Sequence, residues 1–271
     1  MTDLLIHSMR EFSDLILGSL GCAEARHVVE IGAEFGGMSQ MLADYVEAVD
    51  GHLTSIDPAP KHEFLAWAKR ASQVTHVAAP SLEVIDTLQN VDAWVIDGDH
   101  NYYTVFHELQ AAARVGKRDG KPLLAFLHDV SWPTARRDMY YAPERIPPEY
   151  RHPHTFGAGA MLGRIDLVPG QGFRGEQAWA MANRSGGPRN GVLTAVEDFI
   201  AESTASGRPL AFAHVPAVFG LGILFDVEES WSAAIAELVA PYHDNPLLAS
   251  LEQNRLRNYM KVIEWQDRTA A

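Results

Sequence analysis

Two clusters of acidic and histidine side chains carry the groups that could do chemistry in this sequence. Asp97, Asp99 and His100 lie within four positions, and His128 is followed directly by Asp129. Each cluster comes after a continuous apolar run, which is typical of a buried strand. Two carboxylates and an imidazole can bind a divalent cation, or one of them can take a proton from a substrate. Capping the next helix would need only one such residue, so the first cluster indicates more than a cap.

These side chains need a sheet whose strand ends bring them together. Polar groups at the carboxyl ends of neighbouring parallel strands face a common ligand crevice in an open α/β sheet. The run from Val28 to Ile31 is typical of a buried first strand, and Gly32, Gly36 and Gly37 lie in the turn to a helix with one apolar face. We therefore expect a Rossmann-like α/β fold in which this turn holds a nucleotide-like cofactor.

The turn excludes a dinucleotide and favours a cofactor without phosphate. A dinucleotide fingerprint needs a glycine two positions after Gly32, but that position is Glu34. The Glu34 carboxylate would repel a pyrophosphate, whereas S-adenosylmethionine has no phosphate and carries cationic groups. Asp57 ends the next β-rich run, where an acidic residue can accept both ribose hydroxyls of an adenosine. It could instead cap a turn.

Two motifs resemble one enzyme family. The pattern E-x-G-x-x-x-G-G-x-S from Glu30 to Ser39 resembles motif I of the class I S-adenosylmethionine-dependent methyltransferases. The Ile-Asp-Gly-Asp-His-x-Tyr segment, with the later His-Asp, resembles a small-molecule branch with the macrocin-type sugar O-methyltransferases and the cephalosporin-hydroxylase-like proteins. The resemblance implies a seven-stranded, mostly parallel sheet flanked by helices. It also implies that the cofactor contacts Glu30, Gly32, Gly36, Gly37, Ser39, Asp57 and Asp99.

The same resemblance implies a metal site and a base. In relatives, the first acid after the fourth strand and an acidic pair after the fifth strand hold a magnesium-type ion. By position these ligands are Asp97, His128 and Asp129. Relatives usually have a carboxylate in place of His128, so a softer ion such as Mn²⁺ is favoured here over Mg²⁺. Asp99 corresponds to an acid that contacts the cofactor or serves as the base, and His100 competes with it for the role of base.

Composition limits the other possibilities. The 271 residues fit one elaborated domain, 1–271, and 47% hydrophobic residues suffice for a substantial core. A net charge of −13 argues against a nucleic-acid or anionic-membrane partner. Cys22 is the only cysteine, there is no apolar run long enough for a membrane span, and no secretion signal begins the chain. We expect a cytoplasmic protein with a small-molecule substrate.

Three further segments are expected around the sheet. An amphipathic helix lies in residues 1–24, with Leu5 and Met9 on its apolar face and an end near Gly18 to Gly21. The weakly periodic residues 131–190 are rich in aromatic, arginine and histidine side chains, which favours a substrate lid that is partly mobile when empty. The residues from 209 to 225 should form an antiparallel hairpin at one sheet edge. The helix and the lid could pack between subunits of a homo-oligomer.

The leading hypothesis is methyl transfer from S-adenosylmethionine to a hydroxyl of a sugar or another natural-product scaffold, assisted by a divalent metal. Within the lid, Arg136 and Arg137 could bind a substrate carboxylate or phosphate, or pair with surface acids. One alternative is a metal-independent N- or O-methyltransferase with His100, His152 or His154 as the base. Others are a nucleotide-dependent oxidoreductase, which Glu34 disfavours, and a binding protein that has lost its chemistry.

Overall fold

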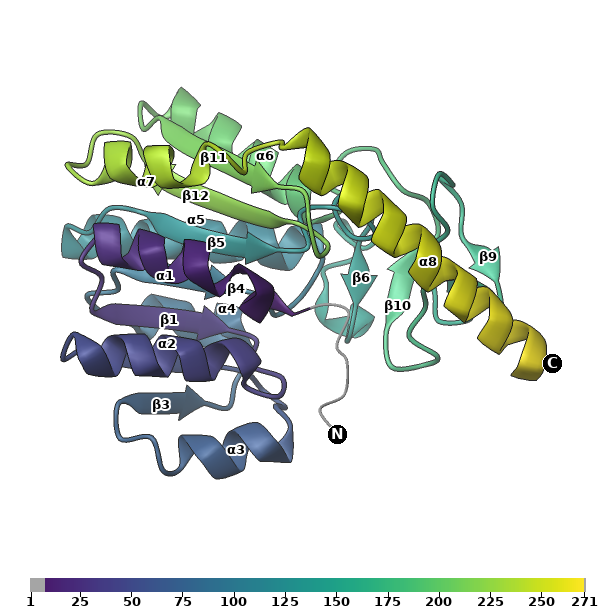
Figure 1. Cartoon of the computed structure of the whole chain (residues 1–271), viewed down its shortest axis with the longest axis horizontal. Coiled ribbons are helices and arrows are strands. Elements are labelled where there is room, and N and C mark those ends of the chain that lie inside the picture. The colour runs from purple at the N-terminus through teal and green to yellow at the C-terminus, as the bar shows by residue number, and fades with distance from the viewer. Residues whose placement is uncertain (1–7, 271) are drawn as a thin grey trace.

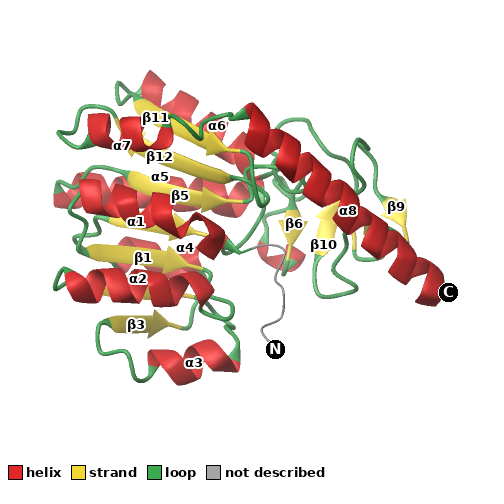
Figure 2. Ribbon diagram, in the orientation of Figure 1, coloured by secondary structure: helices red, strands yellow, loops and turns green. Residues whose placement is uncertain are grey.

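The computed structural model describes residues 8–270 and contains a central sheet of seven strands in the order β11-β12-β5-β4-β1-β2-β3 (Figures 1 and 2). β1 pairs in parallel with β2 and β4, and β2–β3 and β4–β5 are also parallel. The strands are β1 (His27–Ile31), β2 (His52–Ile56), β3 (Val74–Val77), β4 (Ala93–Ile96), β5 (Leu124–His128), β11 (Leu210–Val215) and β12 (Leu221–Asp226). The expected α/β fold with a mostly parallel seven-stranded sheet is confirmed.

The antiparallel edge has the expected hairpin form. β11 and β12 pair antiparallel, and β12 then pairs antiparallel with β5. Gly220, with a φ of 92°, ends the turn between the two strands. The register sets Leu221 opposite His128, so the hairpin lies directly beside the end of β5, where the second chemical cluster begins.

Helices cover both faces of the sheet (Figure 1). Ala93 and Val95 of β4 pack in the core with α1, α2 and α7, whereas Trp94 and Ile96 pack in a second core with α5 and α6. This alternation follows from the two-residue repeat of a strand. The helices are α1 (Ser13–Cys22), α2 (Gly37–Ala48), α3 (His62–Ala68), α4 (Ser81–Val84), α5 (Tyr102–Asp119), α6 (Val192–Ala205), α7 (Ser232–Val239) and α8 (Pro246–Ala270), with 3₁₀ turns η1 (Met9–Phe12) and η2 (Ile85–Thr87). No helix within residues 8–270 is long and apolar enough to cross a membrane.

The N-terminal helix differs from its expected limits. The structure has η1 followed by α1, which continues to Cys22, and both pack on the first core. Residues 1–7, including Leu5, lie outside the described residues. Gly18 and Gly21 do not end the helix: a Cβ at Gly21 would meet nothing, and Gly18 lies against Leu238 of α7. Gly18 therefore allows α1 to pack closely against α7, and neither glycine ends the helix.

Residues 131–190 form a separate layer beyond the carboxyl ends of β4 and β5 (Figure 2). The segment contains β6 (Met139–Tyr140), η3 (Pro143–Arg145), β7 (His154–Thr155), β8 (Ala158–Gly159), β9 (Val168–Pro169) and β10 (Ala180–Ala182). β6, β10 and β7 form one small sheet, and β8 pairs with β9. Arg137 is buried and donates to the carbonyls of Ala182 and Ile165. Buried polar contacts of this kind hold the segment together in place of a large apolar core.

Candidate active site

The glycine turn after β1 is built for close backbone approach. Gly32 has a φ of 88°, and a Cβ there would lie 2.2 Å from the carbonyl oxygen of Asp97. Gly36, with a φ of 82°, occupies the N-cap of α2 against Phe64. Among the described residues, a Cβ at Gly37 would meet only Ser8 Oγ, at 3.9 Å. The turn therefore joins the ends of β1 and β4, and the described residues leave the first turn of α2 uncovered.

Glu30 lies inside the fold beneath this turn. Its Oε2 accepts hydrogen bonds from Ser39 Oγ at 2.7 Å and from Ser55 Oγ at 2.6 Å. Burial raises the pKa of Glu30 to about 7, although the two serine hydroxyls oppose the change. Glu30 and Ser39, both expected to contact the cofactor, are thus brought together as a buried link between β1, β2 and α2.

Asp57, which directly follows β2, binds the backbone of the glycine turn. Its Oδ2 accepts the backbone N–H groups of Ala33 at 2.9 Å and Glu34 at 3.1 Å, and its Oδ1 accepts that of Ala59 at 2.8 Å. The sequence left open whether Asp57 binds ribose or caps a turn, and the structure shows the turn contacts. The exposed Glu34 has a φ of 46°, a strained conformation for a residue with a side chain that the Asp57 contacts support.

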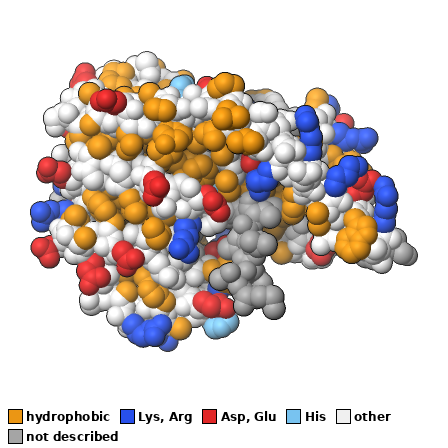
Figure 3. All heavy atoms as spheres, viewed as in Figure 1, with side chains coloured by type: hydrophobic (Ala, Val, Ile, Leu, Met, Phe, Trp, Pro, Cys, Tyr) orange, Lys and Arg blue, Asp and Glu red, His pale blue; other side chains and the backbone are white. Residues whose placement is uncertain are grey.

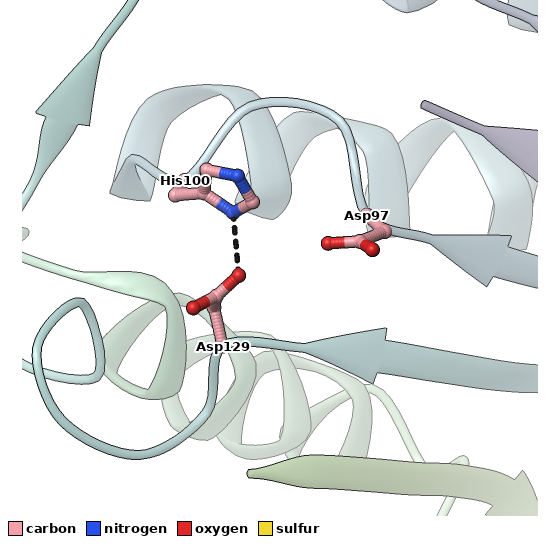
Figure 4. Close-up of side chains that lie close together, drawn as sticks. All are labelled: Asp97, His100 and Asp129. Carbon is pink, nitrogen blue, oxygen red and sulfur yellow. Dashed lines mark ion pairs between the residues drawn. The ribbon is translucent and has the colours of Figure 1, made fainter. Parts of the chain in front are cut away.

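The two chemical clusters meet at the ends of β4 and β5 (Figure 4). His100 Nδ1 lies 3.0 Å from Asp129 Oδ2. His128 Nδ1 lies 3.1 Å from Asp97 Oδ1 and 3.2 Å from Asp129 Oδ2, and His128 Nε2 donates to the carbonyl of Val218 at 2.9 Å. The expectation that both clusters share one crevice is therefore met by direct contacts.

These contacts control the charges of the cluster. Burial alone would lower the pKa of His100, but Asp129, Asp97 and Asp99 outweigh it and raise that pKa to about 9. Asp97 and Asp129 likewise outweigh burial and hold the pKa of His128 well above its usual value. The two histidines keep the pKa of Asp129 well below its usual range despite its burial. Without a bound cation, the cluster is thus a set of carboxylates neutralised by imidazolium groups.

Asp99 has a different environment from the other acids. Its Oδ2 accepts from Thr104 Oγ1 at 3.1 Å, while its Oδ1 is buried and has no hydrogen-bond partner among residues 8–270. Burial raises the pKa of Asp99. The cap of α5 is formed by Asn101, whose Oδ1 accepts from the backbone of Thr104 at 2.9 Å. Capping therefore accounts for Asn101 Oδ1 but not for Asp99.

Three ligand atoms are arranged for a metal ion. One atom each from Asp97, His100 and Asp129 lies within 4.8 Å of the others. Asp97 and Asp129 belong to the expected set of ligands, and His100 does not. His128, the third expected ligand, also lies beside both carboxylates through Nδ1, while its Nε2 donates to the carbonyl of Val218. Carboxylate oxygens with one imidazole nitrogen fit Mg²⁺ less well than Mn²⁺, since imidazole favours the softer metals.

The segment 131–190 approaches this cluster through Tyr141, which the sequence did not single out. The ring of Tyr141 lies 6.0 Å from that of His100 and is half-exposed. Desolvation and the carboxylates of Asp129 and Asp97 raise its pKa above the usual value, so the hydroxyl stays protonated. The backbone N–H of Met139 donates to the carbonyl of His100 at 2.9 Å. Its place in the aromatic-rich residues 131–190, which follow the second cluster, was the available sequence signal.

Other candidates in this segment have structural partners. Arg136 pairs with Glu197 of α6, so of the two roles expected for it, pairing with a surface acid is the one observed. Arg137 is buried against backbone carbonyls rather than open to a substrate. His152 Nε2 bonds the carbonyl of Arg189, and His154 Nδ1 bonds the carbonyl of His152. Among the described residues, His100 alone of the three candidate histidine bases contacts the acidic cluster.

Comparison with known proteins agrees with this arrangement. Residues 29–130 match the family model of a methyltransferase domain, Methyltransf_24. No curated protein matches the sequence.

Solved structures share the fold at low identity. The SAH-bound methyltransferase PaMTH1 of Podospora anserina is 14% identical, with 83% of this chain and 81% of that chain covered and a TM-score of 0.50. The O-methyltransferase TomG of Streptomyces achromogenes, in complex with SAM, is 18% identical over 83% of each chain, with a TM-score of 0.46. Residues 29–130 are thus similar to a methyltransferase domain, and the glycine turn and the side chains of Asp97, His100 and Asp129 lie within the matched residues.

Proposed function

We propose that this protein transfers a methyl group from S-adenosylmethionine to a hydroxyl of a small molecule, assisted by a divalent cation. The observation that carries the proposal is the convergence of Asp97, His100 and Asp129 beside the glycine turn of a methyltransferase domain. The domain match supports the reaction class. The buried, charge-balanced cluster supports metal-assisted handling of an acceptor proton.

The cofactor would bind at the glycine turn. Gly37 leaves the backbone of the first turn of α2 open, and Asp99 presents a buried carboxylate oxygen without a partner among the described residues. These features fit a ligand with hydrogen-bond donors and a positive charge. When bound there, S-adenosylmethionine supplies an activated methyl group on its sulfonium. Glu34 adds negative charge to the turn, which favours this cation over a pyrophosphate.

Asp97 and Asp129 would hold the cation, which would supply positive charge that favours an ionised acceptor hydroxyl. A side chain of the protein must then take the proton that the hydroxyl of the substrate releases. In this assignment His100 is the base and not a ligand of the cation: it binds Asp129 through Nδ1, and its Nε2 would face the acceptor. With its pKa at about 9, His100 is already protonated near neutral pH. Neutralising the surrounding carboxylates would lower that pKa and convert His100 into a base.

The acceptor would lie under residues 131–190. Tyr141 offers a neutral phenol and an aromatic face at the cluster, which suits a polar ring-containing molecule. The side chains of the cluster pack against one another and leave no room for a ligand between them. The acceptor would therefore lie outside the cluster and present one hydroxyl to it. A sugar or another natural-product scaffold has the required hydroxyl groups.

Ligand binding and radiolabelled methyl transfer test this proposal in two stages. We expect S-adenosylmethionine and its demethylated product to raise the melting temperature, and a nicotinamide dinucleotide to leave it unchanged. Methyl transfer to a panel of hydroxyl-bearing sugars and phenols should then depend on Mn²⁺ or Mg²⁺ and stop with chelator. His100→Gln should bind the cofactor but lose transfer. Binding of the nicotinamide alone would overturn the methyltransferase assignment, and full activity in chelator would overturn the metal.

A further inference from the structure

The C-terminal helix α8 has a conventional buried face. Leu256, Met260 and Ile263 are buried, and Glu252 accepts the backbone N–H of Phe219 at 3.1 Å. With successive residues about 100° apart around the axis, these positions fall on one side of the helix. This side anchors α8 to the protein.

The opposite side of α8 is also apolar but faces outward. Leu247, Leu251, Val262 and Trp265 are exposed by 65%, 56%, 51% and 65%, and they are four of the nine large hydrophobic residues recorded as exposed within residues 8–270. Together with the exposed Asn254 and Asn258, they fall within an arc of about 80° directly opposite the buried face. We call these six residues the α8 stripe. Figure 3 shows hydrophobic and basic side chains along this helix. A surface helix normally has one apolar side, so a second one indicates a binding surface.

The spacing of the α8 stripe is symmetric about residue 256. Leu247 and Trp265 are equally far from that centre, as are Asn254 and Asn258, and Leu251 and Val262 differ by one position. A two-fold axis through the centre would place each residue of a pair opposite the other member on an antiparallel helix. This self-complementarity is the property that an isologous interface between identical chains requires.

The polar groups fit the same arrangement. Asn258 Nδ2 donates to Asn254 Oδ1 at 3.4 Å within one helix. The remaining atoms, Asn254 Nδ2 and Asn258 Oδ1, are a donor and an acceptor that the two-fold axis would bring together between chains. A central polar pair fixes the register of paired helices.

We propose that the α8 stripe binds a second copy of this chain, forming an antiparallel, two-fold symmetric helix pair. This pairing goes beyond the proposed reaction and does not depend on it. It also has a structural consequence, because α8 supports residues 131–190: Arg174 pairs with Asp267 at 2.6 Å, and Phe173 contacts the ring of Tyr259. The second copy would therefore bind α8, the helix against which residues 131–190 pack.

Sedimentation and light scattering on the full chain measure the association. We expect a species of twice the 29.9 kDa chain mass at micromolar concentration. Leu251→Glu and Trp265→Glu should each raise the dimer dissociation constant by about 100-fold or more, because the interface would bury the new charge twice. The control Val227→Glu changes an exposed apolar residue outside α8 and should remain dimeric. Circular dichroism checks that each variant keeps the fold.

Disulfide trapping tests the antiparallel register. Leu247→Cys and Trp265→Cys, prepared separately in a Cys22→Ser background, should form a crosslinked dimer only when mixed. Crosslinking of either variant with itself would indicate parallel pairing and would overturn the proposed symmetry. A wild-type chain that is monomeric at all concentrations, or dimers that persist in both glutamate variants, would overturn the proposed interface.

Discussion

Replacing Asp129 with Asn should remove a pH-dependent part of the protein's stability. Asp129 accepts contacts from His100 at 3.0 Å, from His128 at 3.2 Å and from Thr134 Oγ1 at 3.2 Å. Its φ of 63° lies in the left-handed region, which Asn also tolerates. Asp129→Asn therefore keeps the shape and backbone of the site and removes one buried negative charge.

The magnitude follows from the His100 pKa. A rise from 6.5 to about 9 corresponds to about 3 kcal/mol of stabilisation. A histidine whose pKa is raised by folding contributes this stability fully below the unfolded pKa of about 6.5, and loses it as pH rises through about 9. The lowered Asp129 pKa expresses the same contact and adds no second contribution. Asp97 and Asp99 also raise the His100 pKa, so we expect Asp129→Asn to be up to about 3 kcal/mol less stable than wild type near pH 6, with the difference shrinking as pH rises through about 9.

Thermal and urea unfolding in chelator measure this difference without a bound cation. For a chain of this size, about 3 kcal/mol corresponds to a fall in melting temperature of roughly 6–12 °C near pH 6. The matched control is Asp226→Asn, which removes a buried acid paired with Arg208. Arginine does not titrate in this range, so that variant should lose the same stability at both pH values. If Asp129→Asn keeps the wild-type pH dependence, the assigned charges of the cluster are wrong.

Five further variants test three separate parts of the site. Asp97→Asn should lower the rate of methyl transfer by about 100-fold or more while cofactor affinity changes less than about threefold, as separate kinetics and calorimetry would show. Gly32→Ala should lose about 2–4 kcal/mol in urea unfolding because its Cβ would lie 2.2 Å from the Asp97 carbonyl, whereas Gly37→Ala should lose less than about 1 kcal/mol. Tyr141→Ala should raise the KM for the acceptor about tenfold and Tyr141→Phe less, with cofactor binding unchanged in both; an unchanged KM in both would remove Tyr141 from the acceptor site.

The sheet and the convergence of the clusters could be predicted because they follow from local patterns. Apolar runs ended by polar residues define strands, and parallel strands present their carboxyl ends on one edge. That reasoning placed Asp97 and Asp129 together, although they are far apart in the sequence. It also predicted the hairpin beside β5, since two β-rich runs flank Phe219 and Gly220.

The hydrogen-bond partners of individual side chains within the site could not be predicted in the same way. The bond from His128 Nε2 to the carbonyl of Val218, 90 residues later, has no signal in the sequence. Asp57 uses both carboxylate oxygens on backbone N–H groups of the turns around it. Such partners depend on how the loops close, and the sequence pattern contains only the residue types.

The order of residues 131–190 was also beyond the sequence pattern. Asp138 is buried and accepts the backbone N–H groups of Tyr102 and Gly191, both at 2.7 Å. Its own N–H donates to Asn190 Oδ1 at 2.8 Å. These bonds join the beginning and end of the segment to α5 without an apolar repeat, so periodicity alone could not distinguish the segment from a mobile lid.

The hydrogen bonds near the beginning of residues 131–190 link acceptor binding to proton transfer. Asp138 bonds the backbone of Tyr102, and Met139 bonds the backbone of His100, so β6, which Tyr141 directly follows, begins on the turn that carries the proposed base. A shift of this strand would therefore also move His100 relative to Asp129. Since their contact raises the His100 pKa, lengthening it would make the imidazole release its proton more readily. An acceptor that displaces Tyr141 would thus favour the neutral form of the base that it needs.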